Sequence, residues 1–176
     1  PRLLVLGGSL GAQALNTRLP EAIAALPADA RPQVRHQSGA KHADATRAAY
    51  AAADVEAKVE PFIDDMAAAY GWADLIVCRA GALTLAEIAA AGVGAVLVPY
   101  PHAVDDHQTR NAGAFVDAGA ALRIAESDAT PVRLCGELGR LLADRAALLA
   151  MAQAARGLAK PQAAATIADH CLEVAA

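Results

Sequence analysis

A glycine-rich turn near the start of the chain has residue types suited to binding phosphate. Gly7, Gly8 and Gly11 follow the apolar run Leu3-Leu-Val-Leu6, and a helix-forming segment comes next. Glycine lets the backbone approach a phosphate closely, and the N-terminus of the following helix offers N–H groups with a favourable dipole. Ser9 adds a hydroxyl donor. The turn therefore predicts a contact with the diphosphate of a nucleotide. The alternative is a tight turn that needs glycine only for its own geometry.

A second glycine turn lies within residues 77–92, again between an apolar run and a helical segment. In an open parallel sheet, ligands bind beyond the carboxyl ends of the strands, so two such turns can converge on one crevice. Thr84 and Glu87 have the spacing of a capping box. Glu87 therefore either caps its helix or accepts hydrogen bonds from vicinal hydroxyls such as those of a ribose. Arg79 is either a phosphate contact or part of a surface ion pair.

A third polar segment, residues 98–112, leads into another predicted helix. Gln108 and Asn111 lie three residues apart and share a helix face, and their amides can donate to and accept from sugar hydroxyls. The alternative is that they only complete the first helical turn. Asp106 and His107 are adjacent and do not easily face one ion, so neither a metal nor another cofactor is expected.

A fourth segment, Val59-Glu-Pro-Phe-Ile-Asp-Asp-Met66, connects a predicted strand to a helix that Asp64 is expected to cap. Phe62 on this turn can cover a flat base while the backbone of Ile63 reads the edge of that base. The plainer alternative is a hydrophobic staple, in which the aromatic ring packs onto the following helix.

The composition indicates one globular domain. The chain has 176 residues, an apolar fraction of 56% and a net charge of -4. These values exclude disorder and argue against a nucleic-acid binder.

Three widely spaced cysteines indicate neither a disulfide framework nor a zinc site, which fits a reducing cytoplasm. No apolar run reaches the roughly 20 residues that cross a bilayer. Because Pro1 leads straight into a strand, we expect a piece of a larger protein.

Short apolar runs alternate with helix-period stretches, which predicts an α/β fold. The expected architecture is a Rossmann-like open, mostly parallel sheet of about six strands with helices on both faces. Strands are predicted near residues 2–6, 33–37, 56–60, 74–78, 95–99 and 121–124. Helices are predicted near 12–26, 41–53, 64–71, 83–92, 107–118 and 131–144, with a helical tail at about 145–174 that breaks near Gly157 and Pro161.

Taken in order, several strings resemble the MurG family, the glycosyltransferases that add N-acetylglucosamine to lipid I in bacterial peptidoglycan synthesis. They are Gly7-Gly-Ser-Leu-Gly-Ala12, His36-Gln-Ser-Gly39, Phe62-Ile-Asp-Asp-Met66, Ala73 to Glu87, and Pro99-Tyr-Pro-His102 running on to Gln108 and Asn111. The family has two Rossmann-like domains that face a cleft, the GT-B arrangement. The resemblance implies that residues 1–176 are the C-terminal, donor-binding half, whose tail at about 145–174 packs toward the N-terminal domain.

The resemblance also implies how the donor is held. It places the uracil at Phe62 and Ile63 and the ribose at Glu87. The diphosphate is expected at Ser9, the phosphate loop of Gly7, Gly8 and Gly11, and the helix start, with Arg79 nearby. The remaining donor contacts are Leu83 and Thr84 for the diphosphate and Ala82, Gln108 and Asn111 for the N-acetylglucosamine. Ala80 stands where the family often has serine, which removes a hydroxyl contact.

The implied chemistry is an inverting displacement in which an acceptor hydroxyl attacks the anomeric carbon and UDP departs. Helix N-termini, with no metal, are expected to stabilise the leaving group. The acceptor site, the general base and the membrane-docking surface belong to the absent N-terminal half. No catalytic residue is therefore expected here, and the fragment alone is predicted to bind donor without transferring it. The full-length enzyme is expected to be peripheral on the cytoplasmic side of the inner membrane and to serve cell shape and division.

Two other functions are consistent with the residues alone. A UDP-sugar epimerase of the same two-domain plan needs catalytic acids in its cleft, and Asp105 and Asp106 are the nearby candidates. A non-enzymatic α/β module would bind a partner through its alanine-rich helices.

Overall fold

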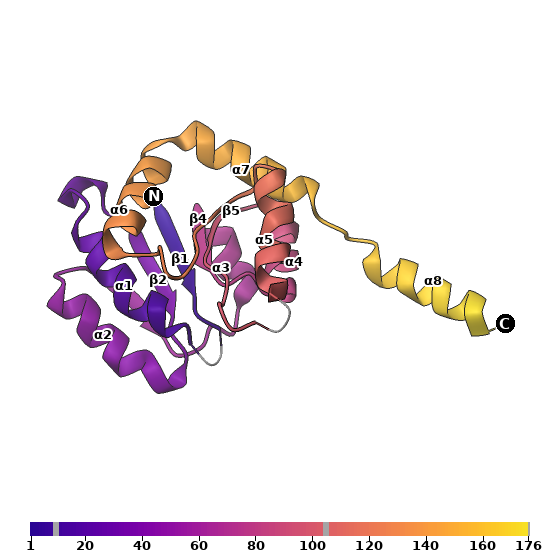
Figure 1. Cartoon of the computed structure of the whole chain (residues 1–176), viewed down its shortest axis with the longest axis horizontal. Coiled ribbons are helices and arrows are strands. Elements are labelled where there is room, and N and C mark those ends of the chain that lie inside the picture. Colours follow the sequence, from indigo (N-terminus) through magenta and orange to yellow (C-terminus); the bar gives the residue numbers. More distant parts are fainter. Residues whose placement is uncertain (9–10, 104–105, 176) are drawn as a thin grey trace.

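A sheet of six parallel strands forms the centre of the computed structural model, which describes residues 1–8, 11–103 and 106–175 (Figure 1). The strands are β1 (Arg2–Leu6), β2 (Gln33–Gln37), β3 (Ala57–Glu60), β4 (Leu75–Cys78), β5 (Gly94–Leu97) and β6 (Ala121–Arg123). The helices are α1 (Gln13–Ala24), α2 (Ala43–Ala52), α3 (Met66–Trp72), α4 (Ala82–Ala91), α5 (His107–Asp117), α6 (Pro131–Ala143), α7 (Arg145–Gly157) and α8 (Ala163–Ala175). The predicted α/β class, strands and helices are confirmed, with the strand and helix bounds before residue 145 shifted by two residues at most.

The strand order is β3-β2-β1-β4-β5-β6, and every neighbouring pair is parallel. The chain first builds outward from β1 to β3 and then returns to the other side of β1 to place β4. The order therefore reverses between β1 and β4, which is the topological switch point of a doubly wound sheet. Leu6 at the end of β1 pairs with Cys78 at the end of β4, so the turns that follow the two strands leave the sheet side by side.

Two apolar layers enclose the sheet, because successive residues of a strand point to opposite faces. Leu3 and Val5 face one layer, together with buried residues of α1, α2 and α6. Leu4 and Leu6 face the other, together with buried residues of α3, α4 and α5. Both faces of the sheet are covered, which explains why the central strands read as continuous apolar runs in the sequence.

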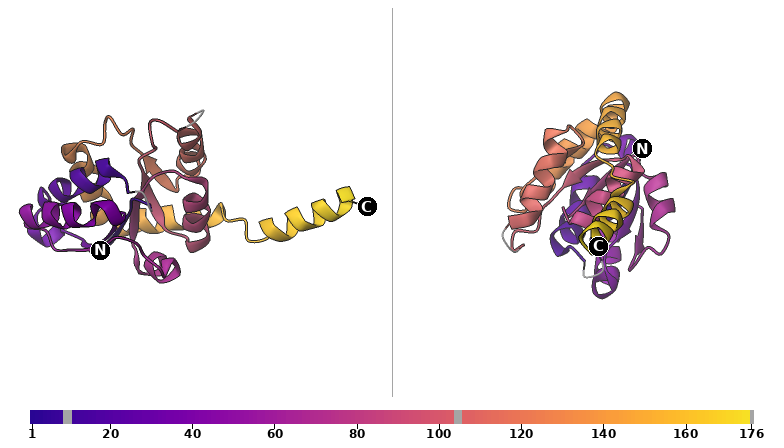
Figure 2. Two further views of the ribbon diagram at one scale, coloured as in Figure 1. Left: turned by 90° about the horizontal axis from the view of Figure 1, so that it is seen from below. Right: turned by 90° about the vertical axis from the view of Figure 1, so that its right-hand side faces the viewer.

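The predicted tail consists of two helices with different surroundings. α7 packs against α4 and β5, and its Ala155 is buried in the second layer. The chain then leaves helical structure near the predicted break at Gly157 and Pro161, and α8 projects away from the domain (Figures 1 and 2). Ile167, Leu172 and Val174 on α8 are more than 60% exposed.

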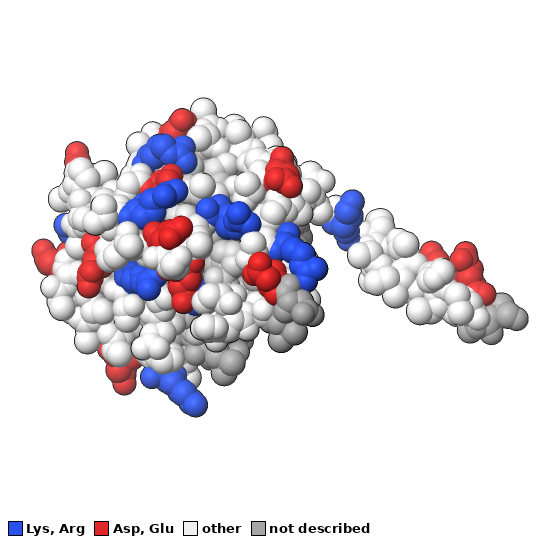
Figure 3. Space-filling model, in the orientation of Figure 1, with Lys and Arg blue, Asp and Glu red and all other residues white. Residues whose placement is uncertain are grey.

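Charged side chains of both signs are interspersed over the folded domain on the face drawn in Figure 3. The projecting helix carries Asp169 and Glu173 toward its end. A binder of nucleic acid concentrates basic groups on one face, and the face in Figure 3 has no such concentration. Within the described ranges, no helix has the length and apolar character needed to cross a membrane.

A buried polar network joins α1, β2 and α2 beneath the glycine turn. The imidazole of fully buried His36 lies 2.9 Å from Asn16 Oδ1 and 3.0 Å from the Tyr50 hydroxyl. Asn16 Nδ2 donates to the Ser38 carbonyl oxygen at 3.0 Å, so Asn16 Oδ1 accepts from His36 Nε2. The Tyr50 hydroxyl then donates to His36 Nδ1. Burial lowers the pKa of His36 from 6.5 to about 3, which keeps the ring neutral.

We predict that His36 makes the free energy of unfolding depend on pH. The folded ring stays neutral down to about pH 3, whereas the unfolded ring takes up a proton near pH 6.5. The stabilisation is fully present above pH 6.5 and is lost as the pH falls toward 3, by up to about 1.4 kcal/mol per pH unit. His36→Gln should lower stability near neutral pH by roughly 1–3 kcal/mol, because it disturbs two buried hydrogen bonds.

Urea unfolding between about pH 7 and pH 4.5 measures this effect. The stability difference between the wild type and His36→Gln should shrink as the pH falls. His170→Gln removes an exposed imidazole on α8 and serves as the control, with a wild-type profile. Parallel profiles for the wild type and His36→Gln would contradict the assignment.

Candidate functional site

The glycine turn after β1 has a backbone shape that requires glycine. Gly8 and Gly11 have φ angles of +75° and +76°, and the Gly7 N–H donates to the Gln37 carbonyl oxygen at 2.8 Å. A Cβ atom on Gly11 would overlap the Ser38 carbonyl oxygen, so this turn packs directly on the turn after β2. Ser9, predicted to meet the diphosphate, lies outside the described residues.

The second turn delivers an uncapped helix N-terminus to the same edge of the sheet. Gly81 is the N-cap of α4 and makes no side-chain cap hydrogen bond. The Leu85 N–H donates to the Gly81 carbonyl at 3.0 Å, so the N–H groups of the three preceding residues, Ala82, Leu83 and Thr84, have no partner within the helix. The capping-box interpretation is therefore wrong, because Thr84 lies in the first turn of the helix and does not precede it.

Glu87 has a side-chain partner that the sequence analysis missed. Its Oε2 accepts a hydrogen bond of 2.7 Å from the Tyr70 hydroxyl on α3. Tyr70 is buried, and burial raises the pKa of its phenol, with the adjacent Glu87 carboxylate adding to the effect. The hydroxyl therefore remains protonated and acts as the donor. The two residues lie on different helices, so no spacing within either helix indicates this contact.

Two amides on α5 hold the second turn in place. Gln108 Oε1 accepts from the Ala80 N–H at 3.2 Å and from the Tyr100 N–H at 3.0 Å. Asn111 Nδ2 donates to the Ala80 carbonyl oxygen at 3.2 Å. These residues therefore do more than complete the first turn of their helix: they tie the turn after β4 to the loop after β5.

Arg79 is an ion-pair residue, but it is not on the open surface. Its guanidinium pairs with Glu126 and donates to the Val98 and Pro99 carbonyl oxygens at 3.1 and 3.2 Å. Only 17% of its side chain is exposed, and its guanidinium carbon lies 5.4 Å from the centre of the Tyr100 ring. The cation is thus fixed next to both glycine turns.

The turn before α3 presents one aromatic ring to the site. Phe62 is 56% exposed, whereas Ile63 is buried. The helix is capped by Asp65, whose side chain accepts from the Ala68 N–H at 2.9 Å, so the prediction of Asp64 as the cap is wrong by one residue. The staple interpretation is also wrong, because the position before the cap is Asp64 and the Phe62 ring stays exposed.

These turns surround a cavity of about 230 Å³ at the switch point, the switch-point cavity. Cys78 lies at its base, where burial raises the pKa of the thiol to about 12 and keeps it uncharged. The lining residues are Leu6, Gly7, Gly8, Gln37, Phe62, Ile63, Met66, Tyr70, Cys78, Arg79, Gly81, Thr84 and Glu87. The structure thus brings together seven predicted residues: Gly7, Gly8, Phe62, Ile63, Arg79, Thr84 and Glu87.

An adjacent groove of about 700 Å³ lies on the other side of Arg79 at the same edge. Gly11, Gln108 and Arg79 are the predicted residues that line it, together with Arg18, Tyr100 and Glu126. Asn111 does not line either hollow, and Ala82 and Leu83 lie at the start of α4 beside them. The site is therefore elongated, with Arg79 between its two parts.

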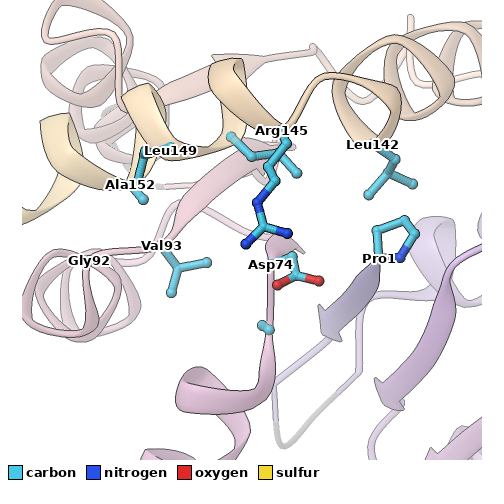
Figure 4. Close-up of a pocket in the computed structure, with 10 residues that line it drawn as sticks. Pro1, Asp74, Gly92, Val93, Leu142, Arg145, Leu149 and Ala152 are labelled. Carbon is cyan, nitrogen blue, oxygen red and sulfur yellow. The ribbon is translucent and has the colours of Figure 1, made fainter.

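A different cavity, of about 380 Å³, opens at the amino edge of the sheet (Figure 4). Arg145 extends across it toward Asp74, with Leu142, Leu149 and Val93 around them. The Asp74 carboxylate already accepts from the backbone and side chain of Arg2, at 2.8 and 3.3 Å. Ligands of doubly wound sheets lie at the carboxyl edge, so this cavity is not the candidate site.

No cluster of three or more metal-ligating side chains occurs in the part of the chain that the structure describes. Of the two acids considered for an epimerase, Asp105 lies outside the described residues. Asp106 is the N-cap of α5, with a left-handed φ of 50° and no cap hydrogen bond from its side chain.

The strand order defines the class: a doubly wound, Rossmann-like α/β domain, with a cavity at the switch point of its sheet, where domains of this class bind ligands. Residues 2–169 match the family described as Glycosyltransferase family 28 C-terminal domain. The chain belongs to this family.

Individual relatives agree with this assignment. A UDP-N-acetylglucosamine--N-acetylmuramyl-(pentapeptide) pyrophosphoryl-undecaprenol N-acetylglucosamine transferase from Marinobacter nauticus is 57% identical over 174 residues, covering 99% of this chain and 48% of the relative. The transferase of the same name from Nitrosococcus oceani is 58% identical, covering 98% and 48%. The crystal structure of MurG from Acinetobacter baumannii superposes with a TM-score of 0.91 at 47% identity, covering 98% of this chain and 52% of that one. The chain thus spans about half the length of these relatives.

We predict that Gly8→Ala and Gly11→Ala differ in their effect on stability. Both substitutions place a side chain at a left-handed φ, which costs about 1–2 kcal/mol. A Cβ atom at Gly8 meets nothing within 4 Å, whereas one at Gly11 overlaps the Ser38 carbonyl and the His42 ring. Gly11→Ala should therefore lower the free energy of unfolding further than Gly8→Ala does. Urea unfolding of both variants measures the difference, and equal losses would show that the two turns do not pack as described.

Proposed function

We propose that the chain binds UDP-N-acetylglucosamine as the donor half of an inverting glycosyltransferase that acts on lipid I. The observation that carries the proposal is the convergence of a glycine turn and an uncapped helix N-terminus on one cavity at the switch point. Both the glycine turn and the helix N-terminus favour binding of an anion with several oxygen acceptors. The relatives carry the names of enzymes that use this donor.

The nucleoside fits the end of the cavity formed by α3 and α4. The exposed Phe62 ring offers a flat apolar surface for the uracil, and the buried Ile63 fixes the backbone beside it. Glu87 lies on the same wall, with a carboxylate that can accept from the two vicinal hydroxyls of the ribose. The uracil and the ribose are therefore proposed to contact different side chains, Phe62 and Glu87.

The diphosphate fits between the two glycine turns. Gly7 and Gly8 on one side face the start of α4 on the other, where Leu83 and Thr84 present backbone N–H groups. Ser9 is proposed as a further donor. Arg79, which is paired with Glu126, places a fixed guanidinium between the cavity and the groove. Because these backbone dipoles are already oriented, they can stabilise the charge that develops on departing UDP without having to reorient.

The sugar is proposed to extend from the diphosphate toward the adjacent groove, near Ala82, Gln108 and Asn111. Gln108 lines that groove. Because Gln108 and Asn111 also hold the backbone of Ala80, each would position the turn as well as meet the sugar. The groove adjoins the switch-point cavity at Arg79, which lines both.

The remaining parts of the reaction belong to the longer protein. We propose that the absent half binds lipid I, supplies the general base and contacts the cytoplasmic surface of the inner membrane as a peripheral protein. The attacking acceptor hydroxyl would form the new glycosidic bond as the bond to UDP breaks.

Membership of a glycosyltransferase family favours transfer over the epimerase and the non-enzymatic module. We propose that α8 packs on the absent half.

Glu87→Ala should weaken UDP-N-acetylglucosamine binding by roughly ten- to a hundredfold, because two charge-assisted hydrogen bonds to the ribose are lost. Isothermal titration calorimetry of the 176-residue chain measures this. The melting temperature should fall only moderately: Glu87 is exposed and does not cap its helix, but the hydroxyl of buried Tyr70 loses its acceptor.

Glu21→Ala is the matched control, because Glu21 is also an exposed helical glutamate but lies on α1 outside both hollows. It should keep wild-type affinity. Wild-type affinity in Glu87→Ala would contradict the ribose assignment, and failure of the wild type to bind UDP-N-acetylglucosamine would contradict the proposed function.

A further inference from the structure

The contact between Tyr70 and Glu87 joins a buried group to an exposed one. Tyr70 is 5% exposed and its ring packs in the apolar layer between the sheet and α3 and α4. Its hydroxyl reaches the edge of that layer and donates to Glu87 Oε2 at 2.7 Å. Glu87 is otherwise exposed, in the second turn of α4. A fixed donor therefore holds a side chain that would otherwise move freely.

The contact restricts both the position and the rotation of the carboxylate. A free glutamate side chain loses considerable rotamer freedom when it is ordered by a ligand. Tyr70 orders it before the ligand arrives, and a preorganised group binds more tightly because less freedom remains to be lost. Since the hydroxyl engages Oε2, the lone pairs of Oε1 and one of Oε2 remain for a ligand in the switch-point cavity, which both residues line.

We propose that Tyr70 is a positioning residue that orients the Glu87 carboxylate toward the 2′ and 3′ hydroxyls of the ribose, and so makes the site select ribonucleoside over 2′-deoxyribonucleoside diphosphates. The inference rests on the proposed function, because it places the ribose at Glu87. The inference adds Tyr70 to the residues that shape the site, and it adds a preference for ribonucleoside diphosphates. The phenol of Tyr70 acts through Glu87 and does not itself touch the nucleotide.

Tyr70→Phe is expected to leave the fold intact. Tyr70→Phe keeps the buried ring and removes one oxygen. The group that loses its partner, the Glu87 carboxylate, is exposed and can be hydrated, so no buried polar atom is left without a hydrogen bond. The melting temperature of the variant should therefore stay close to that of the wild type.

The experiment compares UDP with 2′-deoxy-UDP by calorimetry on the 176-residue chain. The wild type should bind UDP roughly tenfold or more tightly than 2′-deoxy-UDP, because a carboxylate positioned for a hydroxyl is left without it in the deoxy ligand. Tyr70→Phe should weaken UDP binding roughly three- to tenfold and 2′-deoxy-UDP binding less, so that the ratio of the two affinities falls.

A double-mutant cycle tests whether Tyr70 acts through Glu87. In the Glu87→Ala background, Tyr70→Phe should have no further effect on UDP affinity. Tyr50→Phe is the matched control, because it removes the same atom from a buried tyrosine whose hydroxyl bonds to His36 away from the cavity. It should lower the melting temperature and leave the ratio of UDP to 2′-deoxy-UDP affinity unchanged.

The possible results distinguish failure of the proposed function from failure of the inference about Tyr70. If the wild type binds neither nucleotide, the proposed function fails and the inference fails with it. If the wild type prefers UDP and Tyr70→Phe keeps the same ratio, or if Tyr70→Phe still weakens UDP binding in the Glu87→Ala background, the inference alone is overturned.

Discussion

The parallel pairing of β1 with β4 is the constraint on which the site depends. The chain builds β1, β2 and β3 in one direction and then places β4 on the opposite side of β1, so that α1 packs on one face of the sheet and α4 on the other. The two helices diverge from adjacent strand ends and leave a hollow between their N-termini. The register of Leu6 with Cys78 sets both turns at the same height. A hollow at this point therefore follows from the topology before any side chain is considered.

A set of polar contacts behind the turns then fixes their shape. Asn16, tied to His36, holds the Ser38 carbonyl against which Gly11 packs. On the other side, Gln108 and Asn111 of α5 hold Ala80, so the turn before α4 is anchored by side chains of another helix, and the turn before α1 packs on a carbonyl that Asn16 holds. Dipoles that are rigid before a ligand binds stabilise charge more effectively than dipoles that must reorient. The fold therefore supplies preorganisation as well as position, and this is the physical basis for proposing that the turns hold a diphosphate.

The sequence predicted elements well and contacts between elements poorly. Apolar periodicity located the six strands of the described residues, because a covered parallel sheet needs continuous apolar runs and the helices between them keep a different period. The capping box failed because the spacing of Thr84 and Glu87 also occurs inside a helix, and nothing local showed that the extended residue Gly81 would be the N-cap. Asp64 and Asp65 carry the same side chain, so the choice between them depended on helix geometry. The bond from Tyr70 to Glu87 joins different helices and depends on how α3 and α4 pack. The MurG-family resemblance named Glu87 but not the residue that positions it.

We propose that the donor lies at the carboxyl edge of the sheet, at its switch point. A crystal structure of the chain with UDP-N-acetylglucosamine tests it most directly. We expect the uracil beside Phe62, the ribose on Glu87 and the diphosphate between the Gly7–Gly8 turn and the start of α4. A donor bound instead at the amino edge, in the cavity that Arg145 and Asp74 line, or a diphosphate that contacts neither turn, would contradict this placement of the donor.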